Sequence, residues 1–281
     1  MSRNGQKLGL GLGMGFDIPF AEQINAIAQT GFDAIFSEWS EQEPVKAVAQ
    51  CARENGLFYQ SVHAPFGKIE RMWDEDESGD AFLAKLETCL ADCSDANVGI
   101  MVCHVWKGFG NEDHRSAVGV DRFAKLLDRA QTLGVKVAFE NTEGEEYLAL
   151  LWNELRDHPA FGFCIDTGHE MCYNHSRDMI GTYGKSEKLI ATHINDNMGI
   201  TSDKITWHDD AHLVPFDGVA DWKGVTDRLK AVGYRDILTA ELTVKNKPDR
   251  TCNAIYDALS FREYLALVHE RLAKIAQMMA N

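Results

Sequence analysis

The sequence predicts one α/β domain, a single (β/α)8 TIM barrel that spans residues 1–281. Short apolar stretches alternate with amphipathic ones eight times along the chain, and this alternation is typical of the fold. Hydrophobic residues make up 45% of the 281 residues, which is enough for a large buried core. No linker rich in Pro, Gly or Ser divides the chain. A doubly wound open sheet is the main structural alternative.

Eight stretches are predicted strands, because they are short, apolar and bounded by glycine or polar residues. They are 8–14, 34–37, 58–63, 99–104, 135–140, 162–166, 189–195 and 237–241. The first alternates Gly with Leu, and such small residues let neighbouring strands pack closely. Its glycines do not fit the G-x-G-x-x-G nucleotide-binding pattern, because the third glycine comes one place early.

Eight amphipathic stretches are predicted helices. They lie near 18–30, 42–55, 79–97, 115–133, 145–157, 175–187, 221–232 and 259–279. Glycines such as Gly31 and Gly134 end several of them, because glycine adopts the left-handed C-cap conformation at little cost. The acidic stretch 73–80 is predicted to be a solvated loop before the third helix. The last helix is apolar enough to pack on the barrel, and a homo-oligomer is possible.

The composition of the chain limits the partners and the cellular compartment that we expect. The chain has 28 Lys and Arg against 43 Asp and Glu, a net charge of −15, which argues against nucleic acid as a partner. Its seven cysteines are scattered and form no C-x-x-C pair, as expected of free thiols in a reducing compartment. The sequence has neither a signal-peptide pattern nor 18 consecutive apolar residues. We therefore expect a cytoplasmic protein without a membrane partner.

Side chains that can bind a metal follow most of the predicted strands. They are Glu38, His63, His104, Glu140, Asp166 with His169, His193 and Glu241, and the loop after the seventh strand adds His208, Asp210 and His212. Parallel strands deliver such ends to one rim of a barrel, where active sites lie. So many ionisable groups at one rim need a compensating cation. Mixed carboxylate and imidazole ligands suit Mn, Zn, Fe or Co better than Ca.

The tripeptide Asp166-Thr167-Gly168 also occurs at the catalytic carboxylate of aspartic proteases. Here it ends the sixth strand of a β/α alternation, whereas a retroviral-type protease places it in a small all-β subunit. We therefore do not predict a protease.

Seven segments between residues 61 and 242 resemble the xylose isomerase-like TIM-barrel superfamily. They are SVHAP, CHVW, FENT, DTGH, HIND, DDAHLVPFDG and TAEL. This superfamily contains sugar isomerases and epimerases, inosose dehydratases and type IV apurinic endonucleases. The resemblance to ketose 3-epimerases implies one divalent metal held by Glu140, Asp166, His193 and Glu241. It also implies that Glu140 and Glu241 are the catalytic acid/base pair, and that Glu146 and His169 bind the substrate.

One departure from the epimerase pattern favours the endonucleases. The Arg that follows the seventh-strand His in those epimerases is not evident, and Asp210-Ala211-His212 stands in that loop instead. The resemblance to type IV endonucleases implies nine zinc ligands. All nine can be matched, by His63, His104, Glu140, Asp166, His169, His193, Asp210, His212 and Glu241.

Charge favours the sugar enzyme. An endonuclease should present basic and intercalating side chains on its rim loops, and these loops are acidic, with only Lys68, Arg71, Lys107, Arg177 and Lys204 among them. For the same reason we expect a neutral sugar rather than a phosphorylated one. Aromatic residues near the rim that can stack on a sugar are Trp39, Phe66, Trp73, Trp106 and Trp207.

The sequence thus predicts a divalent-metal-dependent ketose isomerase or epimerase that acts through a metal-stabilised enediolate. The metal is expected to be Mn or Zn, with Mg, Co or Fe as alternatives, and the substrate a small sugar or polyol. Substrate contacts are expected from His63, His104, Trp106, Glu146, His169, Asp210 and His212. The alternatives are a keto-sugar or inosose dehydratase or lyase of the same fold, and a tri-zinc apurinic endonuclease.

Overall fold

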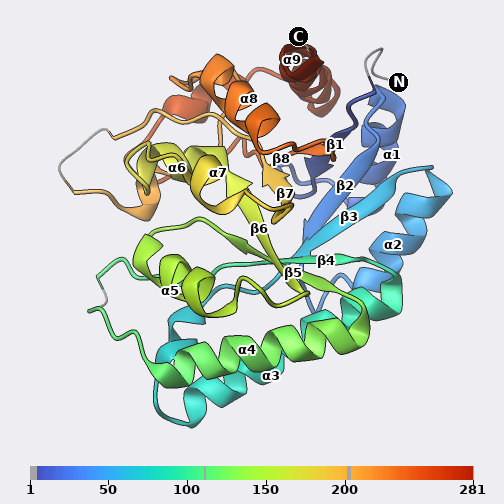
Figure 1. Cartoon of the computed structure of the whole chain (residues 1–281). Coiled ribbons are helices and arrows are strands. Elements are labelled where there is room, and N and C mark those ends of the chain that lie inside the picture. Colours follow the sequence, from blue (N-terminus) through green and yellow to red (C-terminus); the bar gives the residue numbers. More distant parts are fainter. Residues whose placement is uncertain (1–4, 111, 201–203, 281) are drawn as a thin grey trace.

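Eight parallel strands form the centre of the computed structural model, which describes residues 5–110, 112–200 and 204–280 (Figure 1). The strands are β1 (Leu8–Gly11), β2 (Ala34–Glu38), β3 (Phe58–His63), β4 (Ile100–Cys103), β5 (Lys136–Glu140), β6 (Phe161–Asp166), β7 (Leu189–His193) and β8 (Leu238–Ala240). All eight predicted strands are present, five of them shorter than predicted, one with the predicted bounds and two longer by one residue. The (β/α)8 barrel is confirmed.

The strands close into a ring. From β1 to β7 each strand pairs in parallel with the next along the chain, and β1 also pairs with β8. The last gap, between β7 and β8, is closed by a parallel bridge between Ile194 and Ala240, where the Ile194 N–H donates to the Thr239 carbonyl at 2.8 Å. Because all strands run the same way, their C-terminal ends share one rim.

Helices surround the ring, as Figure 1 shows. The α-helices are α1 (Phe20–Thr30), α2 (Val45–Glu54), α3 (Glu77–Ala96), α4 (Ala117–Leu133), α5 (Glu145–Leu155), α6 (Thr167–Cys172), α7 (Met179–Tyr183), α8 (Trp222–Ala231) and α9 (Phe261–Ala280), and the 3-10 helices are η1 (Ile69–Trp73), η2 (Trp207–Asp209) and η3 (Cys252–Tyr256). Local capping sets several boundaries: the Asp76 and Ser116 side chains accept N–H groups of α3 and α4. The predicted C-cap glycines Gly31 and Gly134 are left-handed, with φ of 104° and 70°.

The predicted helix over 175–187 is wrong. Within this range the chain is α-helical over the short helix α7 alone, and another short helix, α6, precedes it. Asp166, the last residue of β6, accepts the N–H of His169 at 2.7 Å and so starts α6 directly after the strand. His175 and Ser176 then adopt left-handed backbone conformations, both with φ of 55°, which no α-helix tolerates. The amphipathic pattern there did not reveal this interruption.

The hydrophobic core has two parts. The larger one lies between the ring of strands and the helices, and includes Leu10, Ile35, Phe139 and Tyr264. The smaller one consists of the fully buried Val102, Ala138, Cys164 and Ala191, with Ile100 and Ile190 packed against it. Its members come from four neighbouring strands, β4 to β7.

Two further expectations from the sequence can be compared with the fold. All seven cysteines are free thiols, five of them buried, in agreement with the scattered pattern. Over the described parts of the chain, no helix combines the length and apolar character needed to cross a membrane.

Candidate metal and active site

Strand periodicity explains why the ionisable residues meet. Side chains two residues apart on a strand point to the same side. His104, Glu140, Asp166 and His193 each come two residues after a member of the smaller core cluster. The small apolar side chains therefore form a floor, and the ionisable ones lie above it at the C-terminal rim.

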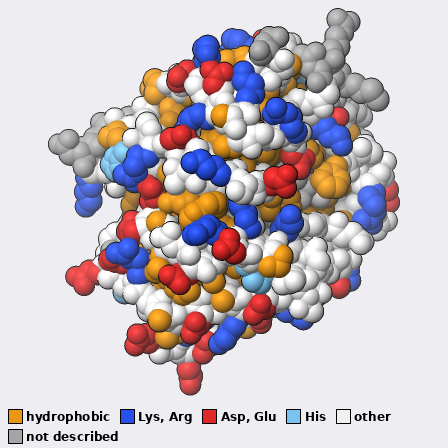
Figure 2. All heavy atoms as spheres, viewed as in Figure 1, with side chains coloured by type: hydrophobic (Ala, Val, Ile, Leu, Met, Phe, Trp, Pro, Cys, Tyr) orange, Lys and Arg blue, Asp and Glu red, His pale blue; other side chains and the backbone are white. Residues whose placement is uncertain are grey.

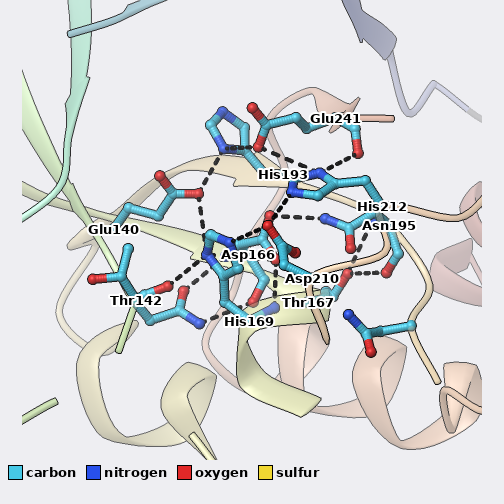
Figure 3. Close-up of polar contacts among 12 residues, drawn as sticks. Glu140, Thr142, Asp166, Thr167, His169, His193, Asn195, Asp210, His212 and Glu241 are labelled. Carbon is cyan, nitrogen blue, oxygen red and sulfur yellow. Dashed lines mark hydrogen bonds and ion pairs between the residues drawn. The ribbon is translucent and has the colours of Figure 1, made fainter. Parts of the chain in front are cut away.

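A cavity of about 950 Å³ opens above these residues. His63, His104, His169, His212 and Glu241 line it, together with Asp210. Glu140, Asp166 and His193 lie beneath them and are at most 1% exposed. Figure 3 shows these acidic and imidazole groups converging from β5, β6, β7, β8 and the loop after β7.

Glu140 is the centre of the arrangement. One of its carboxylate oxygens lies 3.2 Å from Nε2 of His63 and 3.0 Å from Nε2 of His104. The other lies 2.8 Å from Nδ1 of His193, and the same nitrogen is 3.0 Å from a carboxylate oxygen of Glu241. One buried carboxylate thus contacts three imidazoles, and Glu140, Asp166, His193 and Glu241 offer four ligand atoms within 4.8 Å of one another.

Three histidines of the site share one hydrogen-bonding pattern of their ring nitrogens. In each, Nδ1 lies beside a backbone carbonyl, which can only accept, so Nδ1 carries the proton. These pairs are His63 with Ala64 (2.9 Å), His169 with Asn141 (2.9 Å) and His212 with Glu241 (3.1 Å). In each, Nε2 instead faces a carboxylate oxygen, from Glu140 at 3.2 Å, Asp210 at 3.4 Å and Asp210 at 2.8 Å respectively.

This orientation fits cation binding. A neutral ring with its proton on Nδ1 directs a lone pair from Nε2 toward the carboxylate, and that contact is repulsive without a proton or cation between the two atoms. Metal-ligating histidines commonly donate their other N–H to a backbone carbonyl in this way. We therefore take the residue set as suited to a divalent metal, with the mixed nitrogen and oxygen ligands that Mn, Zn, Fe or Co accept.

The pKa values of the site residues show how burial and neighbouring charges compete at this site. Burial lowers the pKa of His104 to about 4, so its ring is neutral and can act as a ligand. Burial also raises the pKa of Asp166 to about 6, against the opposing charges of His169 and His212. Burial alone would lower the pKa of His212, but Asp210 outweighs it and raises that pKa to about 9. The buried carboxylates therefore favour a positively charged neighbour, either a protonated imidazole or a cation.

Asparagine side chains hold the acid at the end of β6. The Asn195 amide donates to Asp166 at 2.7 Å, and Asn141 both accepts from the Asp166 N–H (2.7 Å) and donates to its carbonyl (2.9 Å). Gly168 makes this possible, because a Cβ there would lie 2.0 Å from the Asn195 side-chain oxygen. The glycine of Asp-Thr-Gly is thus explained by packing.

The loop that carries Asp210 and His212 is anchored by a buried carboxylate. Asp196 accepts N–H groups from Asn197, Phe216, Ala220 and the Trp222 indole at 2.9–3.1 Å. It also exchanges two backbone hydrogen bonds with Leu213. This network positions the second acid–imidazole group, in which Asp210 lies 2.8 Å from His212.

The structure brings most, though not all, of the predicted site residues together. Three overlapping groups hold them: His63, His104 and Glu140; Glu140, Asp166, His193 and Glu241; and Asp166, His169 and His212 with Asp210. Glu146 and Trp106 lie apart from these groups and line a separate cavity of about 370 Å³. Glu38 lines the main cavity but belongs to none of the three groups.

Several cavity residues had no signal in the sequence. Glu143, three residues after Glu140, lines both cavities and accepts the Gly108 N–H at 3.0 Å. Tyr173 lines the main cavity and stacks on His169 with ring centroids 4.9 Å apart. Lys245 and Lys247, in the loop after β8, line it with Lys107. Lys245 and Lys247 were not among the basic rim residues predicted from the sequence.

Comparison with known proteins agrees with the fold. A solved IOLI protein with a bound zinc atom has a TM-score of 0.76 at 17% identity, over 97% of this chain and 98% of that one. A D-psicose 3-epimerase solved in the presence of D-fructose has a TM-score of 0.73 at 16% identity, over 98% of this chain and 100% of that one. At these identities the likeness shows the shared barrel alone.

Sequence comparison gives the family. The model for the xylose isomerase-like TIM barrel matches residues 24–264, so the chain belongs to that family. An uncharacterized protein, y4fM, from Sinorhizobium fredii is 32% identical over 121 residues. That match covers 43% of this chain and 32% of the relative, so the chain accounts for about a third of that protein's length.

Proposed function

We propose that this protein is a divalent-metal-dependent sugar isomerase or epimerase that acts on a ketose. The observation that carries the proposal is the position of Glu140 and Glu241. They come from β5 and β8, and their carboxylates approach the same nitrogen of His193 at 2.8 and 3.0 Å. Two carboxylates at one cation site can both bind the ion and move protons on a nearby substrate. The name of the solved D-psicose 3-epimerase agrees with this class of reaction.

The two glutamates have different surroundings. Both oxygens of Glu140 contact histidines, and the residue is fully buried. Glu241 lines the cavity, and its side chain is 21% exposed. We infer that Glu241 removes the proton from the carbon next to the carbonyl, and that Glu140 holds or returns a proton below it. A divalent ion on Glu140, Asp166, His193 and Glu241 would polarise the carbonyl and acidify this C–H bond.

The destination of the proton decides the product. Its return to the same carbon from the other face epimerises the sugar, and its return to the neighbouring carbon isomerises it. Loss of a hydroxyl or glycosidic oxygen instead would make the enzyme a dehydratase or lyase. The product mass distinguishes this elimination from the two transfers, which leave the mass unchanged, and NMR of the product distinguishes the epimer from the isomer.

Solvent exchange tests the proposal. Protein loaded with Mn or Zn is incubated in D2O with a panel of ketoses and inososes, and the sugars are followed by NMR. We expect deuterium at a carbon beside the carbonyl of at least one sugar. Absence of exchange from every sugar, with metal content verified, contradicts the proposal.

A second candidate is hydrolysis of a phosphodiester on several metal ions. It is favoured by the two further groups, His63 and His104 on Glu140, and His169, Asp210 and His212 beside Asp166. The net charge of −15 and the mixed acidic and basic side chains on the face shown in Figure 2 disfavour a polyanionic substrate. Three zinc ions per chain together with nicking of abasic DNA would support this candidate over the first.

A further inference from the structure

Trp207 is an aromatic side chain that remains exposed at the mouth of the main cavity. It lines that cavity and is 46% exposed. Of the other aromatic residues predicted near the rim, Trp73 and Trp106 are buried, and Trp39 is not among the residues that line the cavity. Phe66 lines the cavity, but its ring stacks on His104 at 4.7 Å. Trp207 is therefore the member of this set best able to offer a ring face to a bound molecule.

The segment that carries Trp207 is held in place by several contacts. Trp207 begins the 3-10 helix η2, and Thr206 and Asp209 form a capping box around it. The Thr206 N–H donates to Asp209 at 2.8 Å, and the Asp209 carboxylate, 2% exposed, accepts from the Arg250 guanidinium at 2.5 and 3.1 Å. An exposed indole on a segment held by a part-buried ion pair differs from a side chain on a loose surface loop, because less ordering is needed when a ligand binds.

Polar groups surround the exposed indole. The Lys247 ammonium lies 5.6 Å from the centre of the Trp207 ring and 3.9 Å from a carboxylate oxygen of Asp210. Lys245 and Asn246 line the same cavity. A sugar ring has an apolar C–H face that can stack on an indole and hydroxyl oxygens that accept from ammonium and amide groups. This combination of a flat apolar surface and convergent donors suits such a ring.

The space also exceeds the needs of one sugar. The volume of about 950 Å³ lies near the upper end of the roughly 300–1,000 Å³ typical of small-molecule sites. Trp207, three residues before Asp210, lines this space together with the proposed metal ligand Glu241. A cavity of this volume has room for a molecule with two rings.

We propose that Trp207, Lys245 and Lys247 form an outer subsite for a second sugar ring. The substrate is then a ketose that carries a glycosyl group, a disaccharide-sized molecule. This inference rests on the proposed function for the chemistry of the first ring, and on the cavity and the fixed indole for the second.

Ketose disaccharides test the subsite. Lactulose and maltulose carry their second ring on O4 of the ketose, so that C1 and C3 beside the carbonyl keep their exchangeable C–H bonds, and fructose lacks a second ring. The metal-loaded protein is compared on all three by deuterium exchange in D2O and by saturation-transfer NMR. The variants are Trp207→Ala, Trp207→Phe as a conservative rescue, and Val219→Ala as a control, because Val219 is 63% exposed and does not line the cavity.

We expect a higher kcat/KM for a disaccharide than for fructose. Trp207→Ala should lower the disaccharide value roughly three- to tenfold, the effect of one stacked ring, and leave fructose within twofold. Trp207→Phe should restore most of the loss. Equal use of fructose and the disaccharides, or an equal loss for both sugars in Trp207→Ala, overturns the proposal. If no ketose exchanges, Trp207-dependent saturation transfer to the second ring supports the subsite while the proposed reaction fails, and its absence overturns the subsite.

Discussion

The ends of β5 to β8 and the end of β1 build two parts of one cavity from opposite kinds of residue. Strands β5 to β8 end in Glu140, Asp166, His193 and Glu241, whose ligand atoms gather within 4.8 Å. The segment 11–15, which begins at the last residue of β1, instead lines the cavity with Gly11, Leu12, Gly13, Met14 and Gly15, none of which is ionisable. The comparison shows an asymmetric barrel mouth: one side concentrates ionisable side chains, and the other has none at positions 11–15.

Removing a carboxylate from the ligand side should have the largest effect. Glu140→Gln and Glu241→Gln each keep the size of the side chain but remove its charge and its proton-accepting ability. We expect deuterium exchange into the responsive ketose to fall about 10²–10⁴-fold. Glu154→Gln, an exposed position on α5, is the matched control and should keep full activity. Full turnover by both site variants would remove them from the mechanism.

Removing the proposed cation should lower the thermal stability of the fold, because the acids around it then repel one another. Four buried or half-buried acids, Glu140, Asp166, Asp210 and Glu241, would lose their compensating charge. A ligand at about 100 times its Kd stabilises by about 2.7 kcal/mol, which corresponds to roughly 5–10 °C in Tm for a chain of this size. Thermal unfolding with and without EDTA measures the shift, and added metal should reverse it. An unchanged Tm would indicate that these acids need no cation.

Disturbing the support of Asp166 should weaken metal binding by an intermediate amount. In Gly168→Ala the new Cβ lies 2.0 Å from the Asn195 oxygen, so Asn195 must move away from Asp166. Loss of such an orienting partner typically costs 10–100-fold in metal affinity. Titration calorimetry with Zn or Mn checks this value. Gly99→Ala serves as the control because a Cβ there meets nothing within 4 Å, and equal affinities for the two variants would contradict the role of Asn195.

Adding a side chain at a glycine of segment 11–15 should have the smallest effect on metal binding. A Cβ at Gly11 lies 2.5 Å from the Phe36 ring, which stacks on His193 at 4.6 Å. We expect Gly11→Ala to lower the free energy of unfolding by about 1–2 kcal/mol, as overpacking does, while metal affinity changes little. Urea unfolding compared with Gly99→Ala measures the difference. A large loss of metal binding would show that the glycine segment also affects the metal ligands, which contradicts the division of the cavity into two independent parts.

Much of this organisation could be predicted from the sequence, because strand ends are local features. The alternation of apolar and amphipathic stretches predicted the eight strands. The ionisable side chains at the strand ends and in the loop after the seventh strand predicted most of the groups that meet at one rim. Period-2 alternation fixes which side of a strand each one takes, so Glu140 above Ala138 follows directly.

The misses depend on contacts between distant segments. The break between α6 and α7 arises from the capping of α6 by Asp166 and from left-handed residues at 175 and 176. Glu143 lines the main cavity although no motif in the sequence marks it, and the substrate role that the resemblance implies for Glu146 stays a prediction. Lys245 and Lys247 come from a loop that carries no motif. None of these placements follows from a periodicity.

The most direct test of the central claim is a crystal structure of metal-soaked protein, with anomalous data at the Mn or Zn edge. The account predicts an anomalous peak among the side chains of Glu140, Asp166, His193 and Glu241, within bonding distance of all four. A map from fully loaded crystals with no peak at that position, or with peaks only on surface residues, would contradict it.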